Sequence, residues 1–163
     1  MSIVISDTSP LTNLAAIGRF ELLKSLYGEL YIADAVYQEL NAQARSWPGW
    51  DEVMAARWIH RQTVQNHLLV LALRQDLDAG ESESIVLALE LNAEIILMDE
   101  RDGRHKAQGL GLKTVGVVGI LLAAKAKGIL PDIKSCLDAL RMDAGFYLGN
   151  PVYREALKLA GEL

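Results

Sequence analysis

The chain has only one cysteine, Cys136, in 163 residues. A single thiol cannot form an internal disulfide or a thiolate metal site, so the sequence rules out a disulfide framework and a zinc–thiolate centre. His60 and His67 have no partner at the spacing of metal ligands. Chemistry that requires neither cysteine nor histidine therefore suits this chain best.

Long apolar runs and an excess of positive charge are also absent. The longest uncharged apolar run, residues 115–124, is about half as long as a membrane crossing requires. The N-terminus, MSIVISDTSP, has neither the basic flank nor the cleavage site of a signal peptide. We therefore expect a cytoplasmic protein with no membrane partner. The net charge of −5 disfavours nonspecific binding to duplexes, although acidic residues that hold divalent cations would attract phosphate through those cations.

The composition, 51% hydrophobic and 23% charged, is that of a globular chain. No repeat or linker interrupts it, so residues 1–163 are expected to form a single domain that includes the C-terminal helices, from about residue 129. Strand-like and helix-like patterns alternate along the chain. This alternation predicts an α/β fold, a three-layer α/β/α sandwich with a mostly parallel central sheet.

The expected elements follow from local patterns. Ser9 is the expected N-cap of the first helix, with Pro10 at its first position and Gly18 beyond its end. Strands are expected at residues 3–5, 30–32, 58–64, 94–98 and 113–117. Helices are expected at residues 10–17, 34–40, 52–57, 79–91, 104–109, 120–127, 132–141 and 151–160.

Acidic residues stand where such a sheet would place a ligand site. Asp7 follows the first strand and Asp99 follows the strand that ends at residue 98, and ligands of parallel sheets bind beyond the carboxyl ends of the strands. Asp102 comes three residues later, Glu39 lies in the helix after the second strand, and Glu81 opens the helix before Asp99. We expect Asp7, Glu39, Glu81 and Asp99 to converge within metal-coordinating distance, with Asp102 close by. Hard cations such as Mg²⁺ and Mn²⁺ take oxygen ligands and serve phosphodiester cleavage.

Each acid also has a structural interpretation. Asp7, Asp99 and Asp102 have the positions of turn residues, and Glu39 alone would be a solvated helix residue. Asp78 and Glu81 are spaced as a helix-capping pair. The metal hypothesis therefore depends on the joint placement of these acids and not on any one of them.

Three segments resemble the motifs of PIN domains. IVISDTSPLTNL resembles the first motif, with Asp7 at its aspartate; YIADAVYQEL resembles the second, with Glu39 at its glutamate. GESESIVLALELNAEIILMDERDGR resembles the region of the remaining acids, with Glu81, Asp99 and Asp102 at their positions. The C-terminal part is similar to a PIN-like branch of prokaryotic proteins that share the DTSP, GE and DGR signatures with VapC-type toxins.

The resemblance implies an endoribonuclease that hydrolyses RNA with Mg²⁺ or Mn²⁺. The implied catalytic residues are Asp7, Glu39, Glu81, Asp99 and Asp102, and the implied metal ligands are Asp7, Glu81, Asp99 and Asp102. It also implies a small antitoxin protein as a candidate partner and a homodimer. The chain departs from the family pattern at Glu81, where aspartate is commoner, and at Gly103–Arg104, which replaces the usual aromatic residue.

Other residues have candidate binding roles. The resemblance suggests that Ser9 and Asn13 support the first carboxylate. Arg104 is a candidate for phosphate binding, in a basic cluster with His105 and Lys106. Trp47, Trp50 and Trp58 would either stack on single-stranded bases or form protein contacts.

The last expected helix carries Val152, Leu157 and Leu159 with few evident core partners. This apolar surplus favours a homodimer.

Two other functions remain open at the level of sequence. One is a non-catalytic PIN-like protein that serves dimerisation or partner binding. The other is a haloacid-dehalogenase-like phosphatase, with Asp7 as its nucleophile. That chemistry needs a second aspartate two residues on, where this chain has Ser9.

Overall fold

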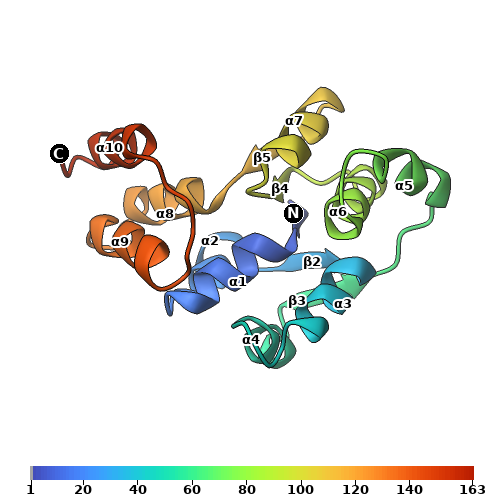
Figure 1. Ribbon diagram of the computed structural model, residues 1–163, viewed down its shortest axis with the longest axis horizontal. Helices are drawn as coiled ribbons and strands as arrows, with labels where there is room; N and C mark the ends of the chain where they lie inside the picture. The colour runs from blue at the N-terminus through green and yellow to red at the C-terminus, as the bar shows by residue number, and fades with distance from the viewer. Residues whose placement is uncertain (1) are drawn as a thin grey trace.

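The computed structural model describes residues 2–163, and in this range five parallel strands form one sheet (Figure 1). The strand order is β3-β2-β1-β4-β5. The strands are β1 (Val4–Ser6), β2 (Leu30–Ala33), β3 (Ile59–Gln62), β4 (Ile95–Leu97) and β5 (Lys113–Val115). All four pairings between neighbours are parallel, which confirms the predicted α/β class.

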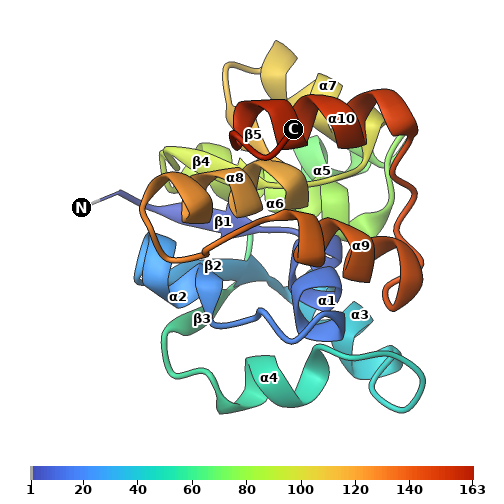
Figure 2. The same ribbon diagram turned by 90° about the vertical axis from the view of Figure 1, so that its left-hand side faces the viewer.

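Helices cover both faces of the sheet, so the molecule has three layers (Figures 1 and 2). One core contains residues of the sheet packed against α5, α6 and α7, and the other contains residues packed against the remaining helices. The helices are α1 (Thr8–Ala16), α2 (Leu22–Tyr27), α3 (Asp34–Ala42), α4 (Trp50–Ala55), α5 (His67–Leu73), α6 (Ala79–Glu90), α7 (Arg101–Gly109), α8 (Val117–Ala126), α9 (Lys134–Met142) and α10 (Asn150–Leu159). The predicted α/β/α sandwich is therefore confirmed.

The start of the first helix differs from the prediction. Helix α1 begins at Thr8, and Asp7, not Ser9, occupies the N-cap position. The reason is that Asp7 still belongs to the sheet: its backbone is extended and its N–H donates to Leu97 O over 2.9 Å. The chain therefore turns into the helix immediately after Asp7. Pro10 then lies at the third helical position, where its missing N–H still costs no intrahelical hydrogen bond.

The topology brings the ends of β1 and β4 together. Strand β1 lies at the centre, with β2 and β3 on one side and β4 and β5 on the other. The chain crosses over between β3 and β4, so a topological switch point lies between β1 and β4. Asp7 directly follows β1, and Asp99 comes two residues after β4. Both acids therefore lie at the same edge of the sheet, at the place where such folds bind ligands.

The C-terminal helices pack onto the same molecule. Glu162 accepts hydrogen bonds from Ile133 N (2.8 Å), Lys134 N (3.1 Å) and Lys125 Nζ (2.9 Å), and so ties the chain end to the start of α9. Tyr153 of α10 donates to Asp138 of α9 over 2.7 Å. Within residues 2–163, no helix has the length and apolar character that crossing a membrane requires.

Candidate active site

Asp7 lies almost buried in a small acidic cavity at the carboxyl edge of the sheet. Its exposed fraction is 4%. The cavity has a volume of about 190 Å³ and is lined by Asp7, Thr8, Ser9, Thr12, Glu39, Gln43, Asp78 and Glu100. Burial raises the pKa of Asp7 well above its ordinary value, and the nearby carboxyl groups of Glu39, Asp78 and Glu81 raise it further. The buried group is therefore one that a cation or a proton would stabilise.

Glu39 is fixed by two hydrogen bonds from other elements. Thr8 Oγ1 donates to its Oε2 over 2.5 Å, and the Gly80 N–H donates to its Oε1 over 3.0 Å. A Cβ atom on Gly80 would lie 2.5 Å from Glu39 Oε1, so any other residue at position 80 would displace this carboxylate. Burial raises the pKa of Glu39, although the Thr8 hydroxyl opposes this shift. The start of α6 thus holds the carboxylate of α3 in place.

Glu81 forms the capping box that its spacing from Asp78 predicted. Its Oε1 accepts from Asp78 N over 3.0 Å, while Glu81 N donates to Asp78 Oδ1 over 2.8 Å. Its Oε2 faces α7, since a Cβ atom on Gly103 would lie 3.2 Å from it. Burial raises the pKa of Glu81. One oxygen of this residue therefore has a structural role, and the other points towards the helix that follows Asp99.

Asp99 is bound on one oxygen only. Its Oδ1 accepts from Val117 N, in the first turn of α8, over 2.7 Å. Its Oδ2 is buried and has no hydrogen-bond partner in the described structure. Burial raises the pKa of Asp99 from 3.8 to about 6, even though the hydrogen bond from Val117 and the charge of Arg104 both lower it. An unpartnered buried carboxylate oxygen is costly unless something else binds it.

Arg104 belongs to α7, and its side chain lies beside Asp99 and Gly116, the residue before α8. Its Nη1 donates to Met98 O over 3.4 Å. A Cβ atom on Gly116 would lie 2.6 Å from Arg104 Nη1 and 2.9 Å from Asp99 Oδ1, so this glycine makes room for both groups. The guanidinium is therefore placed at the candidate site, where the sequence predicted a phosphate-binding group.

The remaining predicted residues lie in different surroundings. Asp102 is exposed in the first turn of α7 and does not line the acidic cavity. Ser9 lines that cavity. Asn13 is buried, and its side chain lowers the pKa of Asp99, so it supports this acid. Its expected support of Asp7 stays a prediction.

The expected convergence of the acids into a metal-binding cluster is not seen among the described residues and stays a prediction. Within residues 2–163, no three histidine, cysteine, aspartate or glutamate side chains are arranged to hold a metal ion. Three of the carboxylates instead accept backbone hydrogen bonds: Glu39 from Gly80, Glu81 from Asp78, and Asp99 from Val117. The sequence interpretation also missed Glu100, which lines the acidic cavity and raises the pKa of both Glu81 and Asp99. Its position next to Asp99 was the available signal.

These donors nevertheless fit a hard divalent cation. Mg²⁺ takes oxygen ligands and is commonly bound by one or two carboxylates together with water and substrate phosphates, without a closed protein cage. Asp99 Oδ2 supplies a buried acceptor without a partner. The raised pKa values of Asp7, Glu39, Glu81 and Asp99 mark an excess of buried negative charge that a cation would relieve.

The chain is thus a parallel α/β sandwich with acidic side chains at its switch point. The sequence profile of family DUF3368, described as a PIN domain, matches residues 3–162. The chain therefore belongs to the PIN-domain family, as the resemblance predicted. This assignment leaves no place for the haloacid-dehalogenase hypothesis.

The fold is also found among solved structures. The chain is similar to a PilT N-terminus domain protein, SSO1118, from the hyperthermophilic archaeon Sulfolobus solfataricus P2. The TM-score is 0.53 at 22% sequence identity, and the match covers 76% of this chain and 93% of that chain. At this identity the likeness shows the fold alone. No curated protein matches the chain significantly.

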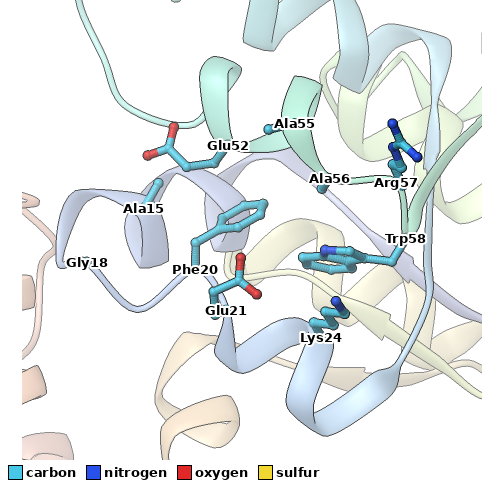
Figure 3. Close-up of a pocket in the computed structure, with 10 residues that line it drawn as sticks. All are labelled: Ala15, Gly18, Phe20, Glu21, Lys24, Glu52, Ala55, Ala56, Arg57 and Trp58. Atoms are coloured by element: carbon cyan, nitrogen blue, oxygen red, sulfur yellow. The ribbon is translucent and has the colours of Figure 1, made fainter.

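A different cavity, of about 610 Å³, lies away from the acids (Figure 3). It is bordered by the end of α1, by α2 and by α4, and it contains none of the candidate acids. Trp58 packs against Phe20 there, with ring centroids 5.6 Å apart. Trp50 likewise packs edge-on against Tyr37 at 5.2 Å. These two tryptophans therefore make protein contacts, while Trp47 is 40% exposed.

Proposed function

We propose that this protein is a divalent-metal-dependent endoribonuclease that hydrolyses phosphodiester bonds of RNA. The observation that carries the proposal is Asp99, whose Oδ2 is buried without a partner at the switch point of a PIN fold. Its pKa of about 6 shows that the negative charge is poorly solvated there. A bound cation would supply the missing partner.

The chemistry follows from the donors. A bound Mg²⁺ or Mn²⁺ ion would activate a water molecule and neutralise charge on the leaving oxygen. Asp7 and Asp99 are the proposed principal ligands, because both are largely withdrawn from solvent at neighbouring strand ends. Glu81 is proposed to contribute through its Oε2, and Asp102 from the first turn of α7. Glu39, held by Thr8 and Gly80, is proposed to orient the attacking water.

Substrate binding is proposed for Arg104. A guanidinium can pair with a phosphate through two parallel hydrogen bonds. Arg104 stands beside Asp99, so a phosphate bound to it would lie next to the proposed metal ligands. Ser9, which borders the acidic cavity, is proposed to contact the same strand of RNA.

The experiment is cleavage of 5′-labelled single-stranded RNA with Mg²⁺, with Mn²⁺ and with EDTA. DNA of the same sequence and a phosphate monoester are tested in parallel. We expect the RNA to be cut only in the presence of metal. Asp7→Asn is expected to be inactive, and Glu155→Gln, which removes an exposed acid on α10, is expected to retain activity. Wild-type protein that leaves RNA intact with both metals would refute the proposal.

A second function is supported by a specific observation. Glu39, Glu81 and Asp99 each accept a backbone hydrogen bond that secures a helix, so the acids have a structural use without metal. A PIN domain that only binds a partner would retain them for that reason. RNA left uncut with every metal, together with a normal melting temperature, would favour this alternative. A small antitoxin protein is the partner that we propose for either case.

A further inference from the structure

A cavity of about 630 Å³ opens beside Asp99, between the start of α8 and the segment that joins α9 to α10. Asp99 and Arg104 are the charged residues of its lining, and Leu122 and Phe146 are among the apolar ones. Tyr147 stands at its border. Small-molecule sites have volumes of about 300–1,000 Å³, are mostly apolar and carry a few convergent polar groups. The cavity therefore has the size and chemistry of a ligand site, and Asp99 and Arg104 of the candidate active site line it.

Tyr147 is an unusual residue for its position. Its exposed fraction is 90%, although it lies in a segment that is fixed on both sides. Phe146 N donates to Leu140 O over 2.9 Å, and Arg141 donates to Leu148 O from Nε (3.0 Å) and from Nη2 (2.7 Å). Leu148 is itself buried. The backbone around Tyr147 is thus held in place while its ring contributes little to the core.

An exposed ring on a fixed backbone segment is well suited to binding a ligand. Ordering a flexible loop opposes association, and a segment fixed beforehand avoids that cost. Aromatic rings in such positions bind unpaired bases by stacking, largely independently of sequence. Arg104, which also lines the cavity, offers a cationic group that can pair with a phosphate. An aromatic ring, apolar side chains and a guanidinium thus line one cavity, and these are groups that bind the base and the phosphate of a nucleotide.

We propose that this cavity, which we call the Tyr147 cleft, binds one unpaired nucleotide of the RNA next to the bond that is cut. The base stacks on Tyr147 against the apolar wall, and the phosphate pairs with Arg104 beside Asp99. The inference rests on the proposed nuclease function for its choice of RNA. It goes further by assigning the segment between α9 and α10 to substrate recognition.

A protein partner fits the cleft less well. An amphipathic helix binds through apolar anchors repeated along several turns of a groove. The cleft instead has two charged residues in its lining, Asp99 and Arg104, and has the volume of one small ligand. A nucleotide would contact both the apolar and the charged residues of such a cavity, whereas an apolar helix would leave the charged residues without partners.

The test is the affinity of the whole protein for a fluorescein-labelled single-stranded RNA, measured by fluorescence anisotropy in EDTA. The absence of metal makes binding independent of cleavage. Tyr147→Ala is expected to weaken binding by about 5- to 100-fold, the range found when a stacking ring is removed. Tyr147→Phe, which keeps the ring, is expected to stay within about twofold of wild type. Met142→Ala removes an exposed apolar side chain outside the cleft and serves as the control.

The outcomes separate the two proposals. Weaker RNA binding by Tyr147→Ala, with wild type unable to cut RNA, would support the cleft and refute the nuclease. RNA cleavage by wild type, with equal binding by wild type and Tyr147→Ala, would overturn the cleft and leave a protein as its occupant. Wild type that does not bind RNA in EDTA, or loss of binding in Met142→Ala alone, would also overturn it. Equal melting temperatures of wild type and Tyr147→Ala are expected, since the side chain is exposed.

Discussion

At the scale of single residues, Asp99 shows how a site of this kind reduces stability. Its carboxylate caps α8 through Oδ1, yet its Oδ2 has no partner and burial raises its pKa to about 6. The folded protein therefore holds a proton on Asp99 more tightly than the unfolded chain does. Because the ordinary pKa is 3.8, Asp99 costs no stability below about pH 4. The cost grows from there to about pH 6 and is complete above it.

Asp99→Asn is therefore expected to raise the melting temperature in EDTA at pH 8. The asparagine Oδ1 can still accept from Val117 N, and the buried charge is gone. The pKa shift from 3.8 to about 6 corresponds to at most about 3 kcal/mol, hence several degrees. The gain should disappear near pH 4. Mn²⁺ should stabilise wild type but not the variant.

Thermal melts at pH 4 and pH 8, with Glu155→Gln as the control, measure this effect. A lower melting temperature for Asp99→Asn than for wild type in EDTA at pH 8 would make Asp99 a structural capping residue. The proposal of a metal ligand would then lose its physical basis.

Arg104→Lys tests the proposed phosphate contact. Lysine retains the charge but not the planar pair of donors, and it cannot reproduce the placement of Nη1 beside Met98 O. We expect the KM for RNA to rise about tenfold or more, since a hydrogen bond to a charged group contributes about 1.5–3 kcal/mol. Arg101→Lys, at an exposed position of the same helix, is the control and should change little. Unchanged RNA affinity and turnover in Arg104→Lys would show that the assignment is wrong.

At the scale of elements, carboxylates from one segment cap helices of another. Glu39 of α3 accepts from Gly80 N at the start of α6, while Glu83 of α6 accepts from Ala35 N at the start of α3. Glu90 accepts from Gln65 N and Asn66 N before α5. A carboxylate at a helix N-terminus satisfies free N–H groups and interacts favourably with the helix dipole. The two helices around the acidic cavity are thus linked by reciprocal bonds.

Elements with local sequence signals could be predicted, whereas an element capped by a distant residue could not. All five strands and the capping box of Asp78 and Glu81 were predicted, because period and spacing are local signals. Helices α2 and α5 were not, because α2 is short and α5 is almost uniformly apolar, without a helical period. The cap of α5 comes partly from Glu90, a residue distant in sequence.

The positions of the acids along the sheet edge were predictable from sequence, whereas the geometry around them was not. Strand ends placed Asp7 and Asp99 at one edge, which topology alone determines. The orientation of Glu39 depends on Thr8 and Gly80, which sequence spacing does not reveal. The same is true of Tyr147, whose exposure depends on how Arg141 fixes the following residue.

Gly80→Ala tests the link between α3 and α6. The added Cβ would lie 2.5 Å from Glu39 Oε1, so Glu39 must move and lose its backbone donor. We expect a loss of RNA cleavage and a decrease of about 1–3 kcal/mol in the free energy of unfolding. Gly109→Ala is the control, because its Cβ would meet nothing within 4 Å. Urea denaturation measures both variants, and equal stabilities would contradict the proposed role of Gly80.

At the scale of the whole molecule, the homodimer stays a prediction with altered support. Leu157, one of the three residues on which it was based, is only 4% exposed and belongs to the core. Val152 and Leu159 are 54% and 67% exposed on α10, and Leu68 and Leu71 are 81% and 66% exposed one turn apart on α5. Exposed apolar faces of this kind favour association.

Light scattering at micromolar concentration is expected to give twice the chain mass of 17.9 kDa. Leu71→Glu and Leu159→Glu, one on each apolar face, identify the face that is buried in the dimer. A wild-type protein with the mass of one chain would contradict the prediction.

The proposed function requires that the acids at the β1–β4 switch point bind a metal ion with which the protein cleaves RNA. The single-turnover rate of RNA cleavage by Asp99→Asn, relative to wild type at saturating Mn²⁺, tests it most directly because that rate isolates the chemical step. A neutral amide is a poorer ligand for a hard cation, so we predict a loss of about 100-fold or more. An Asp99→Asn rate equal to that of wild type would contradict the claim.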